Sequence, residues 1–134
     1  MRARIEPGPV SGIVTAPSSK SYTQRAYAAA LLHKGNTVVY HPGVSDDERA
    51  SLNIVQQLGA VITSKTAEKT EFTSNGVAPA PDTIICGESG LAARLFTPIA
   101  ALSDKALTIT GSGSLLKRPM EGFAEVFPQL GIQL

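Results

Sequence analysis

The sequence has a single cysteine, Cys86, and no tryptophan among its 134 residues. One cysteine excludes an internal disulfide and any metal site built from several cysteines. It is compatible with a reducing compartment, so we expect a cytoplasmic protein. The formal net charge is only +1, and the few aromatic residues do not alternate with basic ones, so nothing indicates a nucleic-acid or anionic-membrane partner. No apolar run reaches the length of a membrane span.

What the chain does have is an apolar content of 43%, enough for one folded domain with a core. Short apolar segments alternate with longer helical patterns, which predicts an α/β protein. Two short extended pieces, 2–5 and 12–15, flank a Pro-Gly-Pro turn. We expect helices at about 20–33, 46–58, 91–102 and 118–130, and strands at 37–40, 60–64, 69–74, 83–86, 106–110 and from 132 onward.

The most informative local pattern lies at the start of the first expected helix. A Pro-Ser-Ser sequence at 17–19 offers helix caps, and Lys20 and Ser21 fall in the first turn. Arg25 lies four residues after Ser21, so the hydroxyl and the guanidinium share one face. Free N–H groups and the helix dipole attract anions at this end of a helix. This pattern predicts a phosphate-binding site, called a seat below, although an ordinary capped helix with solvated cations would look the same.

The chain also repeats itself. Residues 19–43 align with residues 89–113, and a Gln-Leu-Gly sequence at 57–59 recurs at 129–131. Such internal similarity predicts duplicated structural units, here about 17–82 and 83–134. The second copy stops in its strand and lacks the hairpin partner that the first copy has. We therefore expect this chain to be the front of a longer protein.

Four segments, in order, carry a family resemblance. Residues 17–26 resemble a Pro-Gly-Ser-Lys-Ser-x-x-x-Arg-Ala signature, and residues 45–47 match a Ser-Asp-Asp helix start, whose acids we interpret as first-turn residues. Residues 87–94 are similar to Gly-Asn-Ala-Gly-Thr-x-x-Arg, and residues 117–120 resemble an Arg-Pro-Ile/Met segment. These are motifs of the 5-enolpyruvylshikimate-3-phosphate synthase family, and the match corresponds to the N-terminal portion of a longer family chain.

The resemblance implies a fold and an activity. The family fold has two lobes, each built from three βαβαββ units, so this chain would hold one complete and one partial unit of one lobe. Residues 1–16 would belong to the missing lobe, and residues 17–134 to the partial N-terminal lobe. The family enzyme transfers the enolpyruvyl group of phosphoenolpyruvate to the 5-hydroxyl of shikimate 3-phosphate and releases phosphate. It uses no metal or organic cofactor, and we expect the full-length enzyme to be monomeric.

The resemblance also implies roles for five residues. Ser21 and Arg25 would bind shikimate 3-phosphate, Gly90 and Arg118 would bind phosphoenolpyruvate, and Lys20 would contact both substrates. Fixed cations that hold two anions together overcome their repulsion and orient them. The acid–base Asp, Glu and Lys of the family lie in the other lobe. We therefore expect no catalytic residue in this segment and no turnover by the isolated chain.

Departures from the family pattern leave two alternatives open. Gln24 and Glu88 stand where asparagine is common, and a carboxylate at position 88 would oppose an anion unless it faces away or pairs with a cation. One alternative is the related UDP-N-acetylglucosamine enolpyruvyl transferase, whose first motif carries Lys-Asn where this chain has Lys20 and Ser21. The other is a non-catalytic anion-binding module. Binding of shikimate 3-phosphate, but of no UDP-sugar, would support the 5-enolpyruvylshikimate-3-phosphate synthase interpretation over both alternatives.

Overall fold

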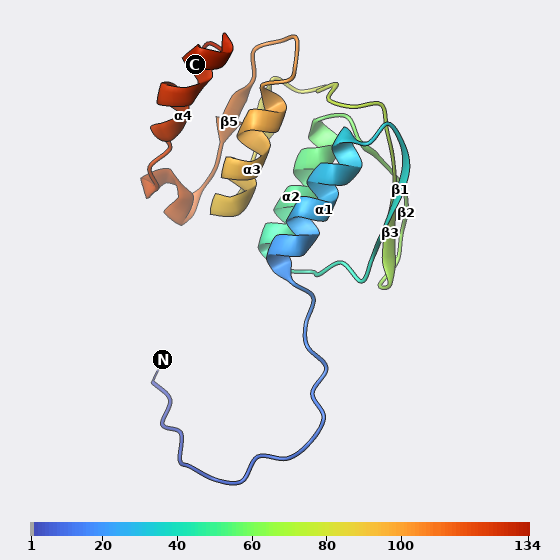
Figure 1. Ribbon diagram of the computed structural model, residues 1–134, viewed down its shortest axis with the longest axis vertical. Helices are drawn as coiled ribbons and strands as arrows, with labels where there is room; N and C mark the ends of the chain where they lie inside the picture. Colours follow the sequence, from blue (N-terminus) through green and yellow to red (C-terminus); the bar gives the residue numbers. More distant parts are fainter. Residues whose placement is uncertain (1) are drawn as a thin grey trace.

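The computed structural model describes residues 2–134, and from residue 20 onward it is a body of helices and short strands (Figure 1). The elements follow one another in a mixed α/β order, as the sequence predicts. They are α1 (Lys20–Leu32), β1 (Gly35–Tyr40), α2 (Asp46–Gln57), β2 (Val61–Lys65), β3 (Lys69–Ser74), β4 (Thr83–Ile85), α3 (Gly90–Ala100), β5 (Thr108–Thr110), the 3-10 helix η1 (Gly113–Lys117), α4 (Gly122–Val126) and the 3-10 helix η2 (Phe127–Leu130).

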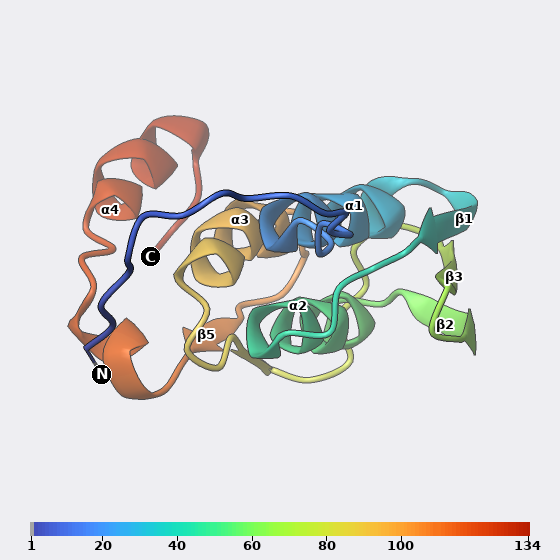
Figure 2. The same cartoon turned by 90° about the horizontal axis from the view of Figure 1, so that it is seen from below.

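The first half of the body is a three-stranded antiparallel sheet covered on one face by helices. The strand order is β1-β3-β2, so β3 is central. Side chains of β3 alternate between partly exposed and buried, and the buried ones include Thr70, Phe72 and Ser74. The Ser74 hydroxyl donates to the Leu31 carbonyl of α1 over 2.6 Å, which fixes the last turn of the helix on the sheet. The view in Figure 2 shows α1, α2 and α3 gathered between this sheet and α4.

The three main helices begin where the sequence places their caps. Ser19 and Ser89 cap α1 and α3, and their side chains accept from the backbone N–H three residues later. Ser45 and Glu48 form a reciprocal capping box at the start of α2. The predicted helices at 20–33, 46–58 and 91–102 are therefore confirmed to within about two residues at their ends.

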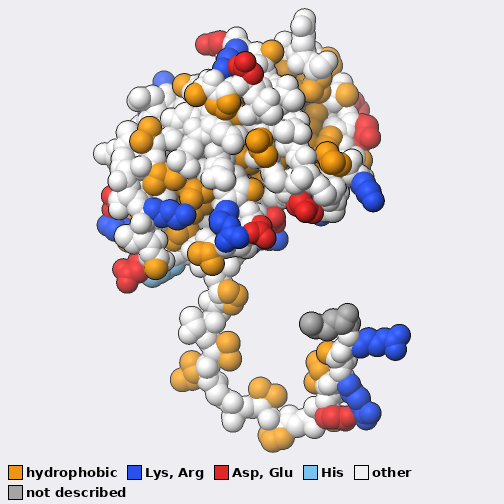
Figure 3. Space-filling model, turned by 180° about the vertical axis from the view of Figure 1, so that it is seen from behind, with side chains coloured by type: hydrophobic (Ala, Val, Ile, Leu, Met, Phe, Trp, Pro, Cys, Tyr) orange, Lys and Arg blue, Asp and Glu red, His pale blue; other side chains and the backbone are white. Residues whose placement is uncertain are grey.

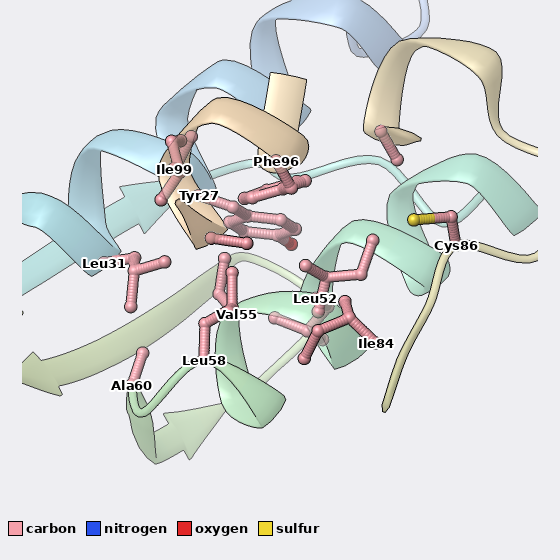
Figure 4. Packing of buried hydrophobic residues seen from close by; sticks show 14 of the residues in the cluster. Tyr27, Leu31, Leu52, Val55, Leu58, Ala60, Ile84, Cys86, Phe96 and Ile99 are labelled. Carbon is pink, nitrogen blue, oxygen red and sulfur yellow. The ribbon is translucent and has the colours of Figure 1, made fainter. Parts of the chain in front are cut away.

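The core lies where these helices meet each other and the sheet (Figure 4). Tyr27 of α1 packs edge-on against Phe72 of β3, with ring centroids 5.4 Å apart. Leu52, Val55 and Leu58 form the apolar stripe of α2 that the sequence predicts, and all three are buried. Among the described residues, no helix is both long and apolar enough to cross a membrane.

The C-terminal part corrects the sequence-based prediction. Strands β4 and β5 pair in parallel, as two short strands joined by α3. The helix expected at 118–130 forms only in part: residues 118–121 are not helical, α4 has five residues, and the chain then continues as η2, whose second residue is Pro128. Pro119 biases the residue before it toward an extended conformation, and Pro128 lacks the N–H that would continue α4. Residues 132–134, expected to begin a strand, pair with no described strand.

Residues 2–19 form no helix or strand and leave the body as an arm (Figure 1). The two extended pieces expected at 2–5 and 12–15 pair with no other described segment. Their larger apolar side chains are at least 90% exposed: Ile5, Val10, Ile13 and Val14. The space-filling view in Figure 3 shows these apolar side chains strung along the arm, away from the body. That this arm belongs to another lobe stays a prediction.

Candidate functional site

The first turn of α1 presents Lys20 beside the first turn of α2. The Lys20 Nζ atom lies 2.7 Å from Oδ2 of Asp47, in an ion pair whose lysine side chain is 54% exposed. The hydrogen bond that Lys20 donates to Asp47, and then the negative charge of that carboxylate, raise the Lys20 pKa above the ordinary 10.5. Lys20 is therefore a permanent cation at neutral pH. Asp47 is a first-turn acid, as interpreted from the sequence, but it also holds this lysine.

The loop between β1 and α2 is fastened to the same end of α1. The Ser18 hydroxyl donates to the His41 carbonyl over 2.7 Å, and the Gly43 N–H donates to the Thr23 hydroxyl over 3.4 Å. His41 has a positive φ of 48°, which lets the chain reverse between the strand and the helix. These contacts bring the N-termini of α1 and α2 together and explain how Asp47 reaches Lys20.

Ser21 and Arg25 lie on neighbouring turns of α1, as their spacing predicts. The Arg25 Nη1 atom donates to the Ser21 carbonyl over 3.1 Å, and the Arg25 side chain is exposed. The guanidinium thus lies over the first turn of the helix. Its other N–H donors make no hydrogen bond with the described residues. Their predicted role in binding shikimate 3-phosphate stays a prediction.

The second predicted seat lies at the start of α3, where Gly90 is buried and Arg118 covers it. A Cβ atom at position 90 would overlap Nη1 of Arg118, so a side chain there would displace the guanidinium. Arg118 directly follows η1. The next residue, Pro119, is held by Arg94 of α3, whose Nη2 donates to the Pro119 carbonyl over 3.0 Å. The guanidinium therefore lies directly against the backbone that opens α3.

The two seats are close to each other. The hydroxyl of Ser89, the N-cap of α3, donates to the buried Oε1 atom of Gln24 in the second turn of α1 over 3.2 Å, which holds the two helix starts together. The positive charge of Arg118 also acts on Lys20 and lowers its pKa, against the larger effect of Asp47. The structure thus brings Lys20, Gly90 and Arg118 into one region. Arg25 and Ser21 extend that region along α1. This clustering joins segments that are up to 98 residues apart in the sequence, from 20 to 118.

One polar residue of this region, noted in the sequence only as a departure from the family pattern, has a structural role that its motif does not indicate. Gln24 is completely buried, and its Oε1 atom accepts hydrogen bonds from the hydroxyls of Ser51 and Ser89. It therefore joins α1 to α2 and to the cap of α3. A long polar residue four positions after Lys20, just before the apolar block of α1, is the only sequence signal that could have indicated it.

Cys86 lies buried just after β4, as the sequence suggests. Burial raises the pKa of its thiol to about 11, so the thiol is protonated at neutral pH. Among residues 2–134, no group of three or more His, Cys, Asp or Glu side chains is placed to hold a metal ion.

Comparisons with known proteins point to one family. The family model described as EPSP synthase (3-phosphoshikimate 1-carboxyvinyltransferase) matches residues 5–134. The chain belongs to the EPSP synthase family. The 3-phosphoshikimate 1-carboxyvinyltransferase of Halobacterium salinarum is 41% identical over 133 residues, which cover 98% of this chain and 31% of that protein. The enzyme of that name from Chlamydia abortus is 34% identical over 129 residues, covering 96% of this chain and 29% of that protein.

A solved structure supports the same family. The EPSP synthase from Acinetobacter baumannii superposes with a TM-score of 0.78 at 27% identity, covering 91% of this chain and 28% of that one. The chain thus spans less than a third of the length of the EPSP synthases it resembles. The family resemblance, read first from four motifs, is confirmed. The boundaries of the repeated units stay a prediction.

Within the EPSP synthase pattern, Glu88 is the departure that needed an explanation, and the structure gives its orientation. Its Oε2 atom accepts from the Ser114 N–H over 3.2 Å. Its carboxyl group occupies the space that a Cβ at Gly113 would take, and Gly113 has a positive φ of 53°. The carboxylate therefore binds the start of η1, the segment that leads to Arg118. This orientation answers how an acid is accommodated beside the second seat.

Proposed function

We propose that the full-length protein transfers the enolpyruvyl group of phosphoenolpyruvate to the 5-hydroxyl of shikimate 3-phosphate, with release of phosphate. In this proposal, the present chain carries the phosphate seat for shikimate 3-phosphate and part of the phosphoenolpyruvate site. The observation that carries it is the clustering of Lys20, Gly90 and Arg118, three residues from separate motifs, at the starts of α1 and α3.

The proposed roles follow from the chemistry of the groups. Ser21 offers a hydroxyl and Arg25 a planar fork of donors to the phosphate of shikimate 3-phosphate. Gly90 lets the backbone approach phosphoenolpyruvate closely, and the Arg118 guanidinium beside it neutralises that substrate's charge. Lys20 lies between the two seats and stabilises the charge of the tetrahedral intermediate that forms where the substrates meet.

Asp47 sets the geometry of Lys20 in this scheme. The carboxylate holds the ammonium group at the start of α1 and leaves it half exposed, so its remaining N–H donors point to solvent or to ligand. Because Lys20 has a raised pKa, it binds anions as a full cation across the physiological range. The groups that would donate and accept protons in the reaction are supplied by the rest of the protein, so we propose that this chain alone has no turnover.

Titration of the 134-residue chain with shikimate 3-phosphate, followed by backbone amide shifts, tests the proposal. We expect the amides of Lys20, Ser21 and Arg25 to move. Lys20→Ala should abolish the response, because it removes a cation of the seat, while Lys65→Ala serves as a matched control in an exposed strand position and should leave it unchanged.

The alternatives predict different outcomes of the same titration. A response to a UDP-amino sugar, with none to shikimate 3-phosphate, would indicate the related enolpyruvyl transferase. No response to either ligand in a folded chain would reject the proposed seat and favour a non-catalytic module. The relatives described above are 3-phosphoshikimate 1-carboxyvinyltransferases, which supports a response to shikimate 3-phosphate and none to the UDP-amino sugar.

A further inference from the structure

Gln24 is the one side chain that directly joins α1, α2 and α3 by hydrogen bonds within the described chain. Its Oε1 atom accepts from Ser51 Oγ at 3.0 Å and from Ser89 Oγ at 3.2 Å. All three side chains are buried, Gln24 completely. Polar contacts that are sealed from water cannot be exchanged for hydration, so they fix the relative positions of the groups they join.

The contact with Ser89 determines how α3 begins. Ser89 is the N-cap residue of α3, and its Oγ accepts from the Ala92 N–H at 3.2 Å. A hydroxyl has one hydrogen to donate, and here that hydrogen goes to Gln24. The lone pairs are then left to face the backbone N–H groups of the first turn. Gln24 thus orients the cap immediately before Gly90.

The same side chain belongs to the helix that carries the first seat. Gln24 lies one turn after Lys20 and directly before Arg25. The Gln24 Nε2 atom has no hydrogen-bond partner within the described chain, and a buried donor without a partner costs free energy. The two hydroxyl contacts are therefore the polar interactions of this side chain that offset the cost of its unpartnered amide nitrogen.

We propose that Gln24 is a positioning residue that couples the two anion seats, one on α1 and one at the start of α3. A ligand that fixes the conformation of the first turns of α1 then also fixes the Ser89 cap and the Gly90 backbone, through Gln24. Coupling of this kind is reciprocal, so each substrate strengthens the binding of the other. The proposal rests on the proposed function for the identity of the two ligands, shikimate 3-phosphate and phosphoenolpyruvate.

The positional part of the proposal is tested without ligand. Gln24→Met keeps the length of the side chain and removes both acceptor contacts together with the unpartnered donor. We expect the amide signals of Gly90 and Ala92 to move in this variant. Ser51→Ala is the matched control, because it also removes one hydroxyl contact of Gln24 but leaves the Ser89 contact in place. Unmoved α3 signals in Gln24→Met, or equal movement in Ser51→Ala, would overturn the positioning role.

The coupling is tested by titrating the 134-residue chain. In the wild type, shikimate 3-phosphate should move the amides of residues 89–92 as well as those of residues 20–25. It should also raise the affinity for phosphoenolpyruvate by about fivefold or more. In Gln24→Met we expect the α1 response to persist, the α3 response to fall by at least half, and the gain in affinity to disappear.

A second variant protects the test against a folding defect. Ser89→Gly removes the same contact from the α3 side, and glycine is a tolerated N-cap residue. It should uncouple the seats in the same way as Gln24→Met. An unchanged α3 response in both variants would overturn the coupling and leave the proposed function standing. A wild-type chain in which α1 does not respond would reject the proposed function, whereas the unliganded comparison of Gln24→Met with Ser51→Ala would still decide the positioning role.

Discussion

Individual residues of this chain act through partners that sequence spacing does not reveal. Lys20, Ser21 and Arg25 could be singled out from the sequence because a helix start places them within two turns. Their partners could not, because Asp47 reaches Lys20 only through the packing of α2 against α1. In the same way, Arg118 covers Gly90 only because η1 returns the chain to the start of α3. Local pattern predicts which residues carry chemistry, and tertiary packing decides what each one contacts.

Glu48 gives a prediction at the residue scale. It is only 3% exposed, and its Oε2 accepts from the Ser45 N–H at 2.9 Å. Burial by itself raises the pKa of this carboxyl, but the hydrogen bonds from Ser45, with smaller effects of the nearby Thr23 and Gly43 donors, outweigh it and lower the pKa below the usual 4.5. A lowered folded-state pKa contributes stability that is present above the unfolded value and lost as pH falls through the folded value.

We therefore expect the free energy of unfolding to fall on acidification below about pH 4.5, in part through Glu48. Glu48→Gln should be less stable than the wild type at neutral pH and should lose less stability on acidification. Glu68→Gln, at an exposed position, is the matched control and should follow the wild-type curve. Urea denaturation at neutral pH and at about pH 4 measures the difference. Equal acid sensitivity of the wild type and Glu48→Gln would contradict the assignment.

At the scale of elements, helices are predicted correctly where a capping residue is followed by an apolar face that the fold buries. The caps Ser19, Ser45 and Ser89 precede helices that are buried on one side, and all three helices form. The segment 118–130 has a helical pattern but contains two prolines, and most of α4 is exposed. Without a buried face to stabilise it, the proline at 128 ends the α-helix. The hairpin of β2 and β3 could be predicted from the sequence, because the two strands follow one another along the chain. The pairing of β1 with β3 and of β4 with β5 could not, because it depends on which helices cover the sheet.

The two sheets should differ in local stability. Strand β3 is central and has hydrogen-bonded neighbours on both sides, whereas β4 and β5 form a separate two-stranded pair of three residues each. A short two-stranded sheet is only marginally stable and opens more readily. We expect the backbone amides of β3 to exchange with solvent more slowly than the Thr108 and Cys86 amides that join the β4–β5 region. Hydrogen exchange followed by NMR measures this, and slower exchange at Thr108 than at Phe72 would refute it.

The whole molecule consists of a packed body and an arm that makes no sheet with it. Removing residues 2–16 should change the free energy of unfolding of the body by less than about 0.5 kcal/mol, because none of their larger apolar side chains is buried. The cut leaves Ser18 in place, and with it the contact to His41. Thermal and urea denaturation of the shortened chain provide the measurement. A marked loss of stability would mean that the arm packs on the body in solution.

At this scale the α/β class and the family could be predicted from the sequence, because the motifs fall at helix starts that the fold preserves. The behaviour of residues 2–19 could not, because an extended segment forms a strand only when a second strand is available to pair with it. The same limit applies to residues 132–134, which have a β-like pattern and no described strand beside them.

The point where the arm meets the body has a mechanical consequence. The arm joins the body at Ser18, directly before the cap of α1 and Lys20, and the Ser18–His41 hydrogen bond is its anchor there. The exposed arm is thus covalently continuous with the turn that carries Lys20, so the residues proposed to bind the first anion lie where the arm meets the packed body. The position of the arm and the geometry of that turn depend on the same hydrogen bond.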